Sequence, residues 1–138
     1  MRLEPHLFFD GTCEEALRFY ATIFGDGIAD LQRYEDSPVA DDMPPEVRKN
    51  VMHATFTSQS IAFAASDSNR ASECTGSRVA LSLWTNDMAE GQRIFDTLSA
   101  GGVVAMPYGK MFWGAMLGML TDRYGIDWMI NCELPIAT

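Results

Sequence analysis

The chain has 138 residues, the length of one ordinary domain, and hydrophobic residues make up 47% of it, which excludes a disordered chain. Its formal net charge of −9 argues against binding to nucleic acid or to an anionic membrane surface, because both need clustered Lys and Arg. No apolar run reaches the roughly 20 residues that span a bilayer. The N-terminal residues contain no apolar signal segment, so we expect a cytoplasmic protein.

The first half of the chain predicts a strand, a helix and then three strands. The apolar run 6–9 ends at Asp10-Gly11, which is typical of a strand followed by a turn. Thr12-x-x-Glu15 is a capping-box pattern, and apolar residues follow it at helical spacing as far as Gly25. A segment rich in Asp and Pro, 35–50, predicts a loop. The three further strands are expected at 28–34, 51–57 and 61–65.

The same order of elements recurs after a polar connector at 67–77. A strand is expected at 79–84, and Asn86-Asp87 supplies a turn and a helix cap. The helix runs from Ala89 to Leu98 and stops at Gly101-Gly102. The last three strands are expected at 103–106, 112–120 and 126–132.

These elements indicate an α+β fold built from two βαβββ modules within one domain, 1–138. Module 1 covers about residues 1–68 and module 2 about residues 78–135. A helix after one strand, followed by a three-strand meander, gives a mixed sheet with helices on one face. The other face is then free to curve around a ligand.

Three cysteines, Cys13, Cys74 and Cys132, are widely spaced and form no CxxC pair, which is not the pattern of a disulfide framework. Free thiols suit a reducing compartment. Cys13 stands where a helix is predicted to begin, and a helix N-terminus can lower the pKa of a thiol. Cys13 could therefore be either a reactive or an inert thiol, and we favour the inert thiol.

Several motifs resemble those of a known family, and they cover nearly the whole chain in order. The motifs are Pro5-His6-Leu7-Phe8-Phe9-Asp10-Gly11, Glu15-Ala16-x-x-Phe19-Tyr20-x-x-x-Phe24-Gly25, Met52-His53-Ala54, Phe112-Trp113-Gly114, Gly118-Met119-x-Thr121-Asp122-Arg123-Tyr124-Gly125-Ile126-x-Trp128 and Ile130-Asn131. With these motifs the chain is similar to the PhnB-like branch of the vicinal oxygen chelate superfamily, which is related to glyoxalase I and bleomycin-resistance proteins. The resemblance implies a cup-shaped sheet with helices on its outer face, homodimers, and pockets for small-molecule ligands in the cups.

Members of this branch have often been labelled ubiquinone-pathway methyltransferases. The sequence gives that label no support. It lacks a GxGxxG-type loop between a strand and a helix, and it lacks the parallel doubly wound pattern that a nucleotide-derived methyl donor usually requires.

Metal-using relatives hold a divalent ion with four His or Glu side chains inside the cup. Matched to those positions, this chain has Arg78, Met129, either Ala62 or Ala64, and His6. Arginine keeps its proton and cannot bind a cation, and a lone thioether does not suit a hard, oxygen-chelating site. We therefore expect neither the glyoxalase-type metal site nor another cofactor.

Strand alternation selects the candidate ligand-binding residues, because alternate side chains share a face of a sheet. His6 lies on the first strand, and His53 faces away from the apolar row of Met52, Ala54 and Phe56. The same alternation separates Trp84 from the leucines of its strand and Asn131 from its apolar neighbours. Trp113 enters from the family motif and its glycine neighbours. The predicted ligand-binding residues are His6, His53, Trp84, Trp113 and Asn131.

Each of these residues also has a structural alternative. His53 could bond a neighbouring strand or loop, Trp113 could pack in the core or a dimer interface, and Asn131 could only satisfy backbone groups. Neither Ser66 nor Ser82 has a histidine that the sequence can place beside it, so no nucleophilic triad is expected.

Two classes of function follow. The first is a metal-free protein that binds a flat, partly apolar small molecule and has no catalytic activity. The alternative is a metal-dependent lyase, isomerase or dioxygenase that uses His6, His53 and a carboxylate such as Glu133 in a rearranged site.

Overall fold

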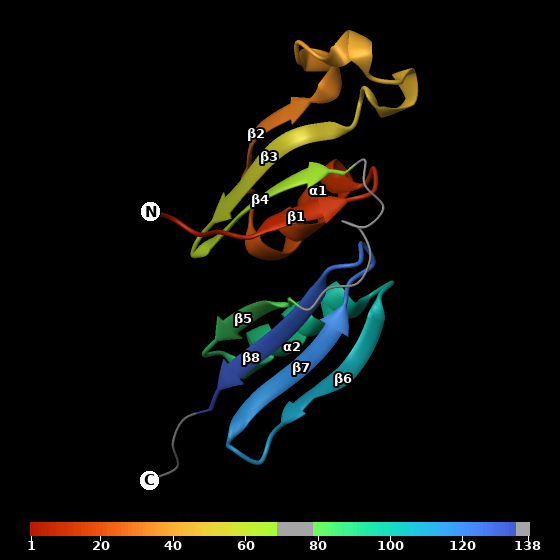
Figure 1. Ribbon diagram of the computed structural model, residues 1–138. Helices are drawn as coiled ribbons and strands as arrows, with labels where there is room; N and C mark the ends of the chain where they lie inside the picture. The colour runs from red at the N-terminus through yellow and green to blue at the C-terminus, as the bar shows by residue number, and fades with distance from the viewer. Residues whose placement is uncertain (69–78, 135–138) are drawn as a thin grey trace. The chain divides into compact units, whose positions relative to one another are not determined.

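The computed structural model describes residues 1–68 and 79–134, and it divides into two compact units, Met1–Thr75 and Gly76–Thr138. Among the described residues, each unit builds one four-stranded mixed sheet and one α-helix (Figure 1). The element order in each unit is strand, helix and three strands, so the α+β fold with two βαβββ modules is confirmed. None of the described helices is long and apolar enough to cross a membrane.

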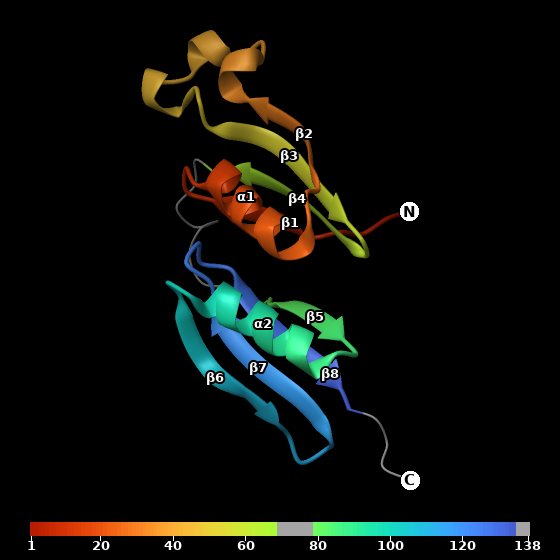
Figure 2. The ribbon, with the colours of Figure 1, turned by 180° about the vertical axis from the view of Figure 1, so that it is seen from behind.

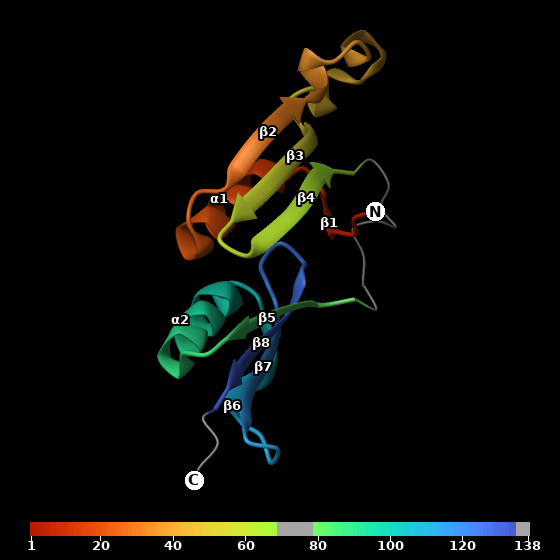
Figure 3. The same cartoon turned by 90° about the vertical axis from the view of Figure 1, so that its left-hand side faces the viewer.

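The first unit has the strand order β1-β4-β3-β2, with β1 parallel to β4 and the other neighbours antiparallel. Its helix, α1, covers one face of this sheet, as Figures 2 and 3 show. The elements are β1 (His6–Phe9), α1 (Cys13–Phe24), β2 (Ile28–Arg33), β3 (Val51–Ser58) and β4 (Ile61–Asp67).

The second unit repeats this topology with the order β5-β8-β7-β6, in which β5 is parallel to β8. Helix α2 covers one face of the sheet (Figure 2). The elements are β5 (Leu81–Thr85), α2 (Met88–Ser99), β6 (Val103–Lys110), β7 (Ala115–Thr121) and β8 (Asp127–Glu133).

Aromatic packing under α1 forms the core of the first unit. Phe63 stacks on Phe56 with ring centroids 5.1 Å apart and meets the edge of Tyr20 at 6.1 Å. All three rings are buried, so β3 and β4 turn these alternate side chains toward the helix. We call the opposite face of each sheet, which carries no helix of its own unit, the open face.

In the second unit a glycine allows the helix to approach the sheet closely. A Cβ on Gly118 would lie 2.5 Å from Phe95 of α2 and 2.9 Å from Tyr108 of β6. Gly118 pairs with Ile130, which is fully buried on the helix side of β8. The close approach therefore lets Phe95 fill the space over β7, where any side chain would collide with it.

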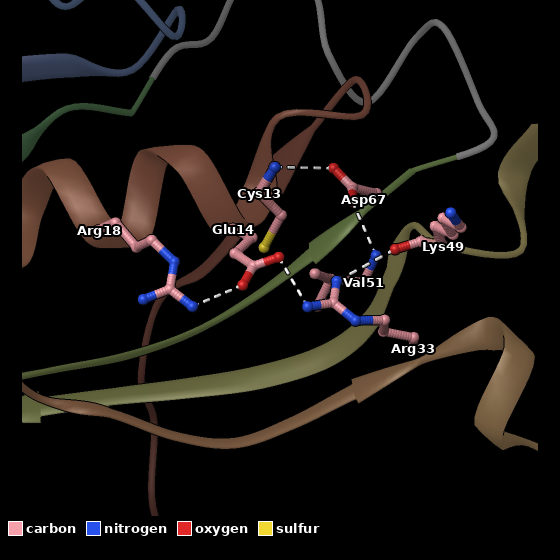
Figure 4. Close-up of polar contacts among 7 residues, drawn as sticks. All are labelled: Cys13, Glu14, Arg18, Arg33, Lys49, Val51 and Asp67. Atoms are coloured by element: carbon pink, nitrogen blue, oxygen red, sulfur yellow. Dashed lines mark hydrogen bonds and ion pairs between the residues drawn. The ribbon is translucent and has the colours of Figure 1, made fainter.

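The two helices begin in different ways. Asp87 caps α2 as expected, since its side chain accepts hydrogen bonds from the backbone N–H groups of Ala89 and Glu90 at 3.0 and 3.1 Å. The capping box predicted for α1 is wrong, because Thr12 makes no side-chain cap bond. Instead the carboxylate of Asp67, from the end of β4, accepts the N–H of Cys13 at 2.9 Å (Figure 4).

Several boundaries differ from those predicted. Strand β6 runs on through Pro107, with register shifts on either side of Met106, and β7 starts only at Ala115. A proline is tolerated there because β6 is an edge strand. The expected loop at 35–50 contains three short 3₁₀ turns, and most of the expected connector, together with Cys74 and Arg78, lies outside the described residues.

Candidate functional site

A histidine and a serine meet on the open face of the first sheet. Strands β1 and β4 run parallel, with His6 beside Ala64 and Phe8 beside Ser66. A hydrogen bond of 3.0 Å joins His6 Nε2 to Ser66 Oγ. Ser66 is only 7% exposed, so its hydroxyl is held in place by the sheet and the imidazole together.

His53 comes to the same place from β3. Its partner on β2 is Gln32, and the β3–β4 register, continued by one residue from Ala54 and Ala65, sets it across from Ser66. The imidazole centroids of His6 and His53 are 6.3 Å apart, and the ring of Phe8 is 4.7 Å from that of His6. We call His6, Phe8, His53 and Ser66 the histidine cluster.

The expectation that Ser66 has no histidine beside it is wrong. The two residues lie 60 positions apart in the chain, and only the parallel pairing of β1 with β4 brings them together. A serine bonded to an imidazole is one part of a nucleophilic site, but a base oriented by a third group and an oxyanion hole are also needed. The pair is therefore better suited to holding a polar group of a ligand.

The open face of the second sheet carries Trp84 and Asn131 on neighbouring strands. They are direct register partners in the parallel pair β5–β8. Trp84 is 61% exposed, whereas Asn131 is buried and its Nδ2 donates to Ser82 Oγ at 2.8 Å and to the carbonyl oxygen of Leu83 at 3.2 Å. Asn131 thus holds Ser82 beside the indole, and its own contact with a ligand stays a prediction.

Trp113 lies in the turn between β6 and β7 and not on a strand. It meets Phe112 edge to face with ring centroids 4.8 Å apart, and these side chains are 57% and 97% exposed. The turn is closed by a hydrogen bond from Met111 N–H to the carbonyl oxygen of Ala115 at 2.7 Å, and Gly114 takes a φ of 87° that favours glycine. The exposed ring pair does not support packing of Trp113 in the core of its own unit.

The structure therefore sorts the predicted residues into separate groups. His6 and His53 lie together in the first unit, while Trp84 and Asn131 lie together in the second. Trp113 stands at the tip of a hairpin of the second unit. Phe8 and Ser66 were not among the predicted site residues. Their alternation with Leu7 and Ala65 indicates which face of the sheet they are on, but the sequence does not show that their two strands pair.

The donor set does not fit the divalent metal of the glyoxalase-type relatives. Of the matching positions, Ala62 and Ala64 carry no donor atom, and Met129 offers a thioether on the open face of the other unit. Arg78 lies outside the described residues. Across residues 1–68 and 79–134, no three His, Cys, Asp or Glu side chains are grouped closely enough to hold a metal ion.

The buried thiol at the start of α1 is not activated. Desolvation raises the pKa of Cys13 to about 12, and the negative charges of Asp67 and Glu14 add to this effect. The thiolate would thus be unfavourable despite the nearby helix N-terminus. Cys13 is fully buried and free, which agrees with an inert residue.

Glu14 links α1 to the edge strand β2. Its carboxylate accepts hydrogen bonds from Arg18 and Arg33, both at 2.7 Å (Figure 4). These bonds lower the pKa of Glu14, the one from Arg18 contributing most. The contact is structural, since α1 lies on the side of the sheet away from the histidine cluster.

The motif near the C-terminus, which carries much of the family resemblance, builds a turn. Asp122 Oδ1 accepts the N–H groups of Tyr124 and Ile126 at 2.9 and 3.0 Å, and Oδ2 accepts the indole N–H of Trp128 at 2.9 Å. Both Asp122 and Trp128 are buried. These bonds therefore fix the turn that leads into β8.

Comparison with known proteins extends the resemblance. The family model described as 3-demethylubiquinone-9 3-methyltransferase matches residues 1–131. Protein YjdN of Escherichia coli (strain K12) is 28% identical over an alignment 139 residues long, which spans 95% of this chain and 95% of YjdN.

Solved structures agree. The crystal structure of protein PA1353 from Pseudomonas aeruginosa is 37% identical, with a TM-score of 0.84 over 98% of this chain and 99% of that one. A PhnB protein from Bacillus cereus, whose description carries the same methyltransferase name, is 28% identical, with a TM-score of 0.80 over 98% of this chain and 100% of that one.

More distant solved structures share the fold of this chain. A glyoxalase/bleomycin resistance protein/dioxygenase from Nocardioides shares the fold with a TM-score of 0.58 at 17% identity, over 100% of this chain and 87% of that one. The strand orders of both units differ from a parallel doubly wound sheet, so the fold gives no support to the methyltransferase part of the family's description. The chain belongs to the PhnB-like family that bears the 3-demethylubiquinone-9 3-methyltransferase description, and it shares its fold with a protein described as a glyoxalase/bleomycin resistance protein/dioxygenase.

Proposed function

We propose that this protein binds a flat, partly apolar small molecule on the open faces of its sheets, without a metal ion and without catalysis. The ligand-contacting residues in this proposal are His6 and His53 in the first unit. In the second unit they are Trp84 and Trp113, with Asn131 positioning Ser82. Each group combines ring surfaces for stacking with placed polar groups.

The observation that carries this proposal is the composition of the histidine cluster. The His6 imidazole is bonded to the buried hydroxyl of Ser66 at 3.0 Å, and the rings of Phe8 and His53 have centroids 4.7 and 6.3 Å from its own, on a face that carries no helix of its own unit. A polar cluster with a purely structural role does not need an exposed phenyl ring beside it, and Phe8 is 37% exposed. On the second sheet the largely exposed indole of Trp84 also supports ligand binding on the open face.

A metal-dependent lyase, isomerase or dioxygenase is the second candidate. The closeness of the two imidazoles, at 6.3 Å, favours it, because histidine is the commonest ligand for transition metals. The carboxylate suggested as a third ligand, Glu133, ends β8 in the other unit. Two imidazoles alone are fewer than the three protein ligands of a typical catalytic site.

We also propose a cytoplasmic homodimer. The free thiols of Cys13 and Cys132 suit a reducing compartment. Largely exposed apolar side chains, such as Val103 at the start of edge strand β6 and Phe112 in the turn after that strand, suit burial against a second copy. Light scattering at micromolar concentration tests the dimer, and a monomer would contradict it.

Ligand binding is tested by fluorescence titration with 2-naphthol, a neutral planar probe. Two of the three tryptophans, Trp84 and Trp113, are largely exposed and can report a nearby ring. Trp84→Ala should weaken binding by on the order of 1 kcal/mol through lost contact area. Met88→Ala, which removes a half-exposed apolar side chain on the helix side of the same unit, should leave binding unchanged. Equal affinity in both variants would reject the assignment of Trp84.

A further inference from the structure

We propose that the histidine cluster binds an oxyanion, a carboxylate or a phenolate, carried on a planar ring. This inference rests on the proposed function and names the class of ligand for the open face of the first unit. It follows from the hydroxyl, imidazole and amide donors on this face, and from the lack of a carboxylate among the four side chains Phe8, Ser66, His53 and Gln32.

Hydrogen-bond donors follow one another across this face. Phe8 on β1 lies beside Ser66 on β4, the continued register brings His53 on β3 next, and Gln32 on β2 pairs with His53. Hydroxyl, imidazole and amide groups can all donate, and none of these four side chains is a carboxylate. A cationic ligand would therefore find no counter-charge in this row, whereas an oxyanion would find several donors.

Carboxylates near these residues in the chain have other partners. Asp67, which follows Ser66, accepts the N–H groups of Cys13 and Val51 at 2.9 and 2.8 Å. Glu4, two residues before His6, pairs with Arg2 at 3.5 Å. On β2, Asp30 lies 3.4 Å from the hydroxyl of Thr55. These acids border the row but do not belong to it.

The bond between His6 and Ser66 prepares the site for negative charge. In the tautomer in which His6 Nε2 carries the hydrogen, Nε2–H donates to Ser66 Oγ and the serine hydroxyl hydrogen is directed to another acceptor. An oxyanion bound to that hydroxyl would thus be hydrogen-bonded directly by Ser66, and the bond from His6 would polarise the hydroxyl group. Because Ser66 is 7% exposed, these groups need little reordering when the ligand arrives.

The phenyl ring of Phe8 explains why the ligand should be planar. It lies 4.7 Å from the His6 imidazole, at an angle of 36°, and is 37% exposed beside the donors. A ring stacked on Phe8 brings its substituent oxygen toward Ser66, the register partner of Phe8.

The test uses three probes of one ring size and different charge: benzoate, benzyl alcohol and benzylamine. The chain contains only two histidines, so the imidazole signals in proton NMR report this site without labelling, and His53→Gln assigns them. We expect benzoate to bind at least about tenfold more tightly than benzylamine and to shift both imidazole signals, since bonds to a charged acceptor are the stronger ones. Equal affinity for the two probes, or no shift with benzoate up to its solubility limit, would overturn the oxyanion assignment.

Variants locate the binding. Ser66→Ala should weaken benzoate binding by roughly 10- to 150-fold, the size expected from the loss of one hydrogen bond to a charged acceptor, and Ser66→Thr, which keeps the hydroxyl, should restore it if the variant is folded. Ser60→Ala is the matched control, because it removes an exposed serine from the turn between β3 and β4 of the same unit. Equal losses in the two alanine variants would contradict the proposal.

Failure here would be distinguishable from failure of the proposed function. If 2-naphthol binds and depends on Trp84 while benzoate shows no preference over benzylamine, the protein binds small molecules but the histidine cluster does not select oxyanions. If neither probe binds, both proposals fall.

Discussion

A single buried carboxylate can hold two elements of one unit together. Asp67 is 3% exposed, yet its two carboxylate oxygens each accept a backbone N–H, one at the start of α1 and one at the start of β3 (Figure 4). One residue earlier in the same strand, Ser66 faces the other way and bonds His6. Adjacent residues of β4 therefore serve the core and the open face.

Replacing Asp67 with Asn should lower the free energy of unfolding by about 1 to 3 kcal/mol, because an amide has one acceptor oxygen for two N–H donors and leaves one of them unpaired. Urea unfolding measures the change. Asp10→Asn, at an exposed position of the β1–α1 turn, should stay within about 0.5 kcal/mol of the parent. A similarly small effect for Asp67→Asn would show that the two bonds contribute little.

The Cys13 thiol should resist modification in the folded protein. Burial and the neighbouring carboxylates raise its pKa to about 12, so the reactive thiolate is scarce at neutral pH. Iodoacetamide labelling followed by peptide mass spectrometry should show slow modification of Cys13 in the native protein and rapid modification in urea. Native labelling at the rate of a free cysteine would contradict the burial of this thiol.

At the scale of elements, the sequence predicted what depends on local patterns. The alternation in β8 and the Asp87 cap of α2 were visible because each involves neighbours along the chain. The cap of α1 was not, since its acceptor comes from Asp67, 54 residues away from Cys13. The Ser66–His6 pair was missed for the same reason, since neither strand's own sequence shows that β1 pairs with β4.

Gly118 tests the contact between α2 and its sheet. Gly118→Ala should destabilise the protein by about 1 to 3 kcal/mol, because the added methyl group meets Phe95 and backbone atoms of β6. Gly109→Ala is the matched control on the neighbouring strand, where the nearest atom to an added Cβ is 3.9 Å away. Equal melting temperatures for the two variants would show that the close packing of α2 on Gly118 does not contribute to stability.

The contact between α1 and β2 should depend on pH through Glu14. Its pKa is lowered by the bonds from Arg18 and Arg33, so its stabilising contribution is fully present above the ordinary carboxyl pKa and is lost as the pH falls through the lowered value. Glu14→Gln should therefore be less stable than the parent at neutral pH, with a difference that shrinks in acid. A difference that is the same at every pH would exclude this carboxylate as its source.

For the whole molecule, the repeated order of strand, helix and three strands predicted two modules, and the family resemblance implied the same fold. The ligand could not be predicted in this way. The candidate residues reach the open faces through strand pairing, and the fold supports many chemistries, so function has to be argued from the groups on those faces.

The most direct test of metal-free binding compares the protein with and without metal. Protein purified without chelators is analysed for its metal content, and 2-naphthol is then titrated into chelator-treated protein and into samples supplied with Zn, Ni, Fe or Mn. The proposed function predicts less than stoichiometric metal and the same affinity in every sample. Stoichiometric metal, with binding that disappears on chelation and in His6→Ala, would contradict it and favour the metal-dependent enzyme.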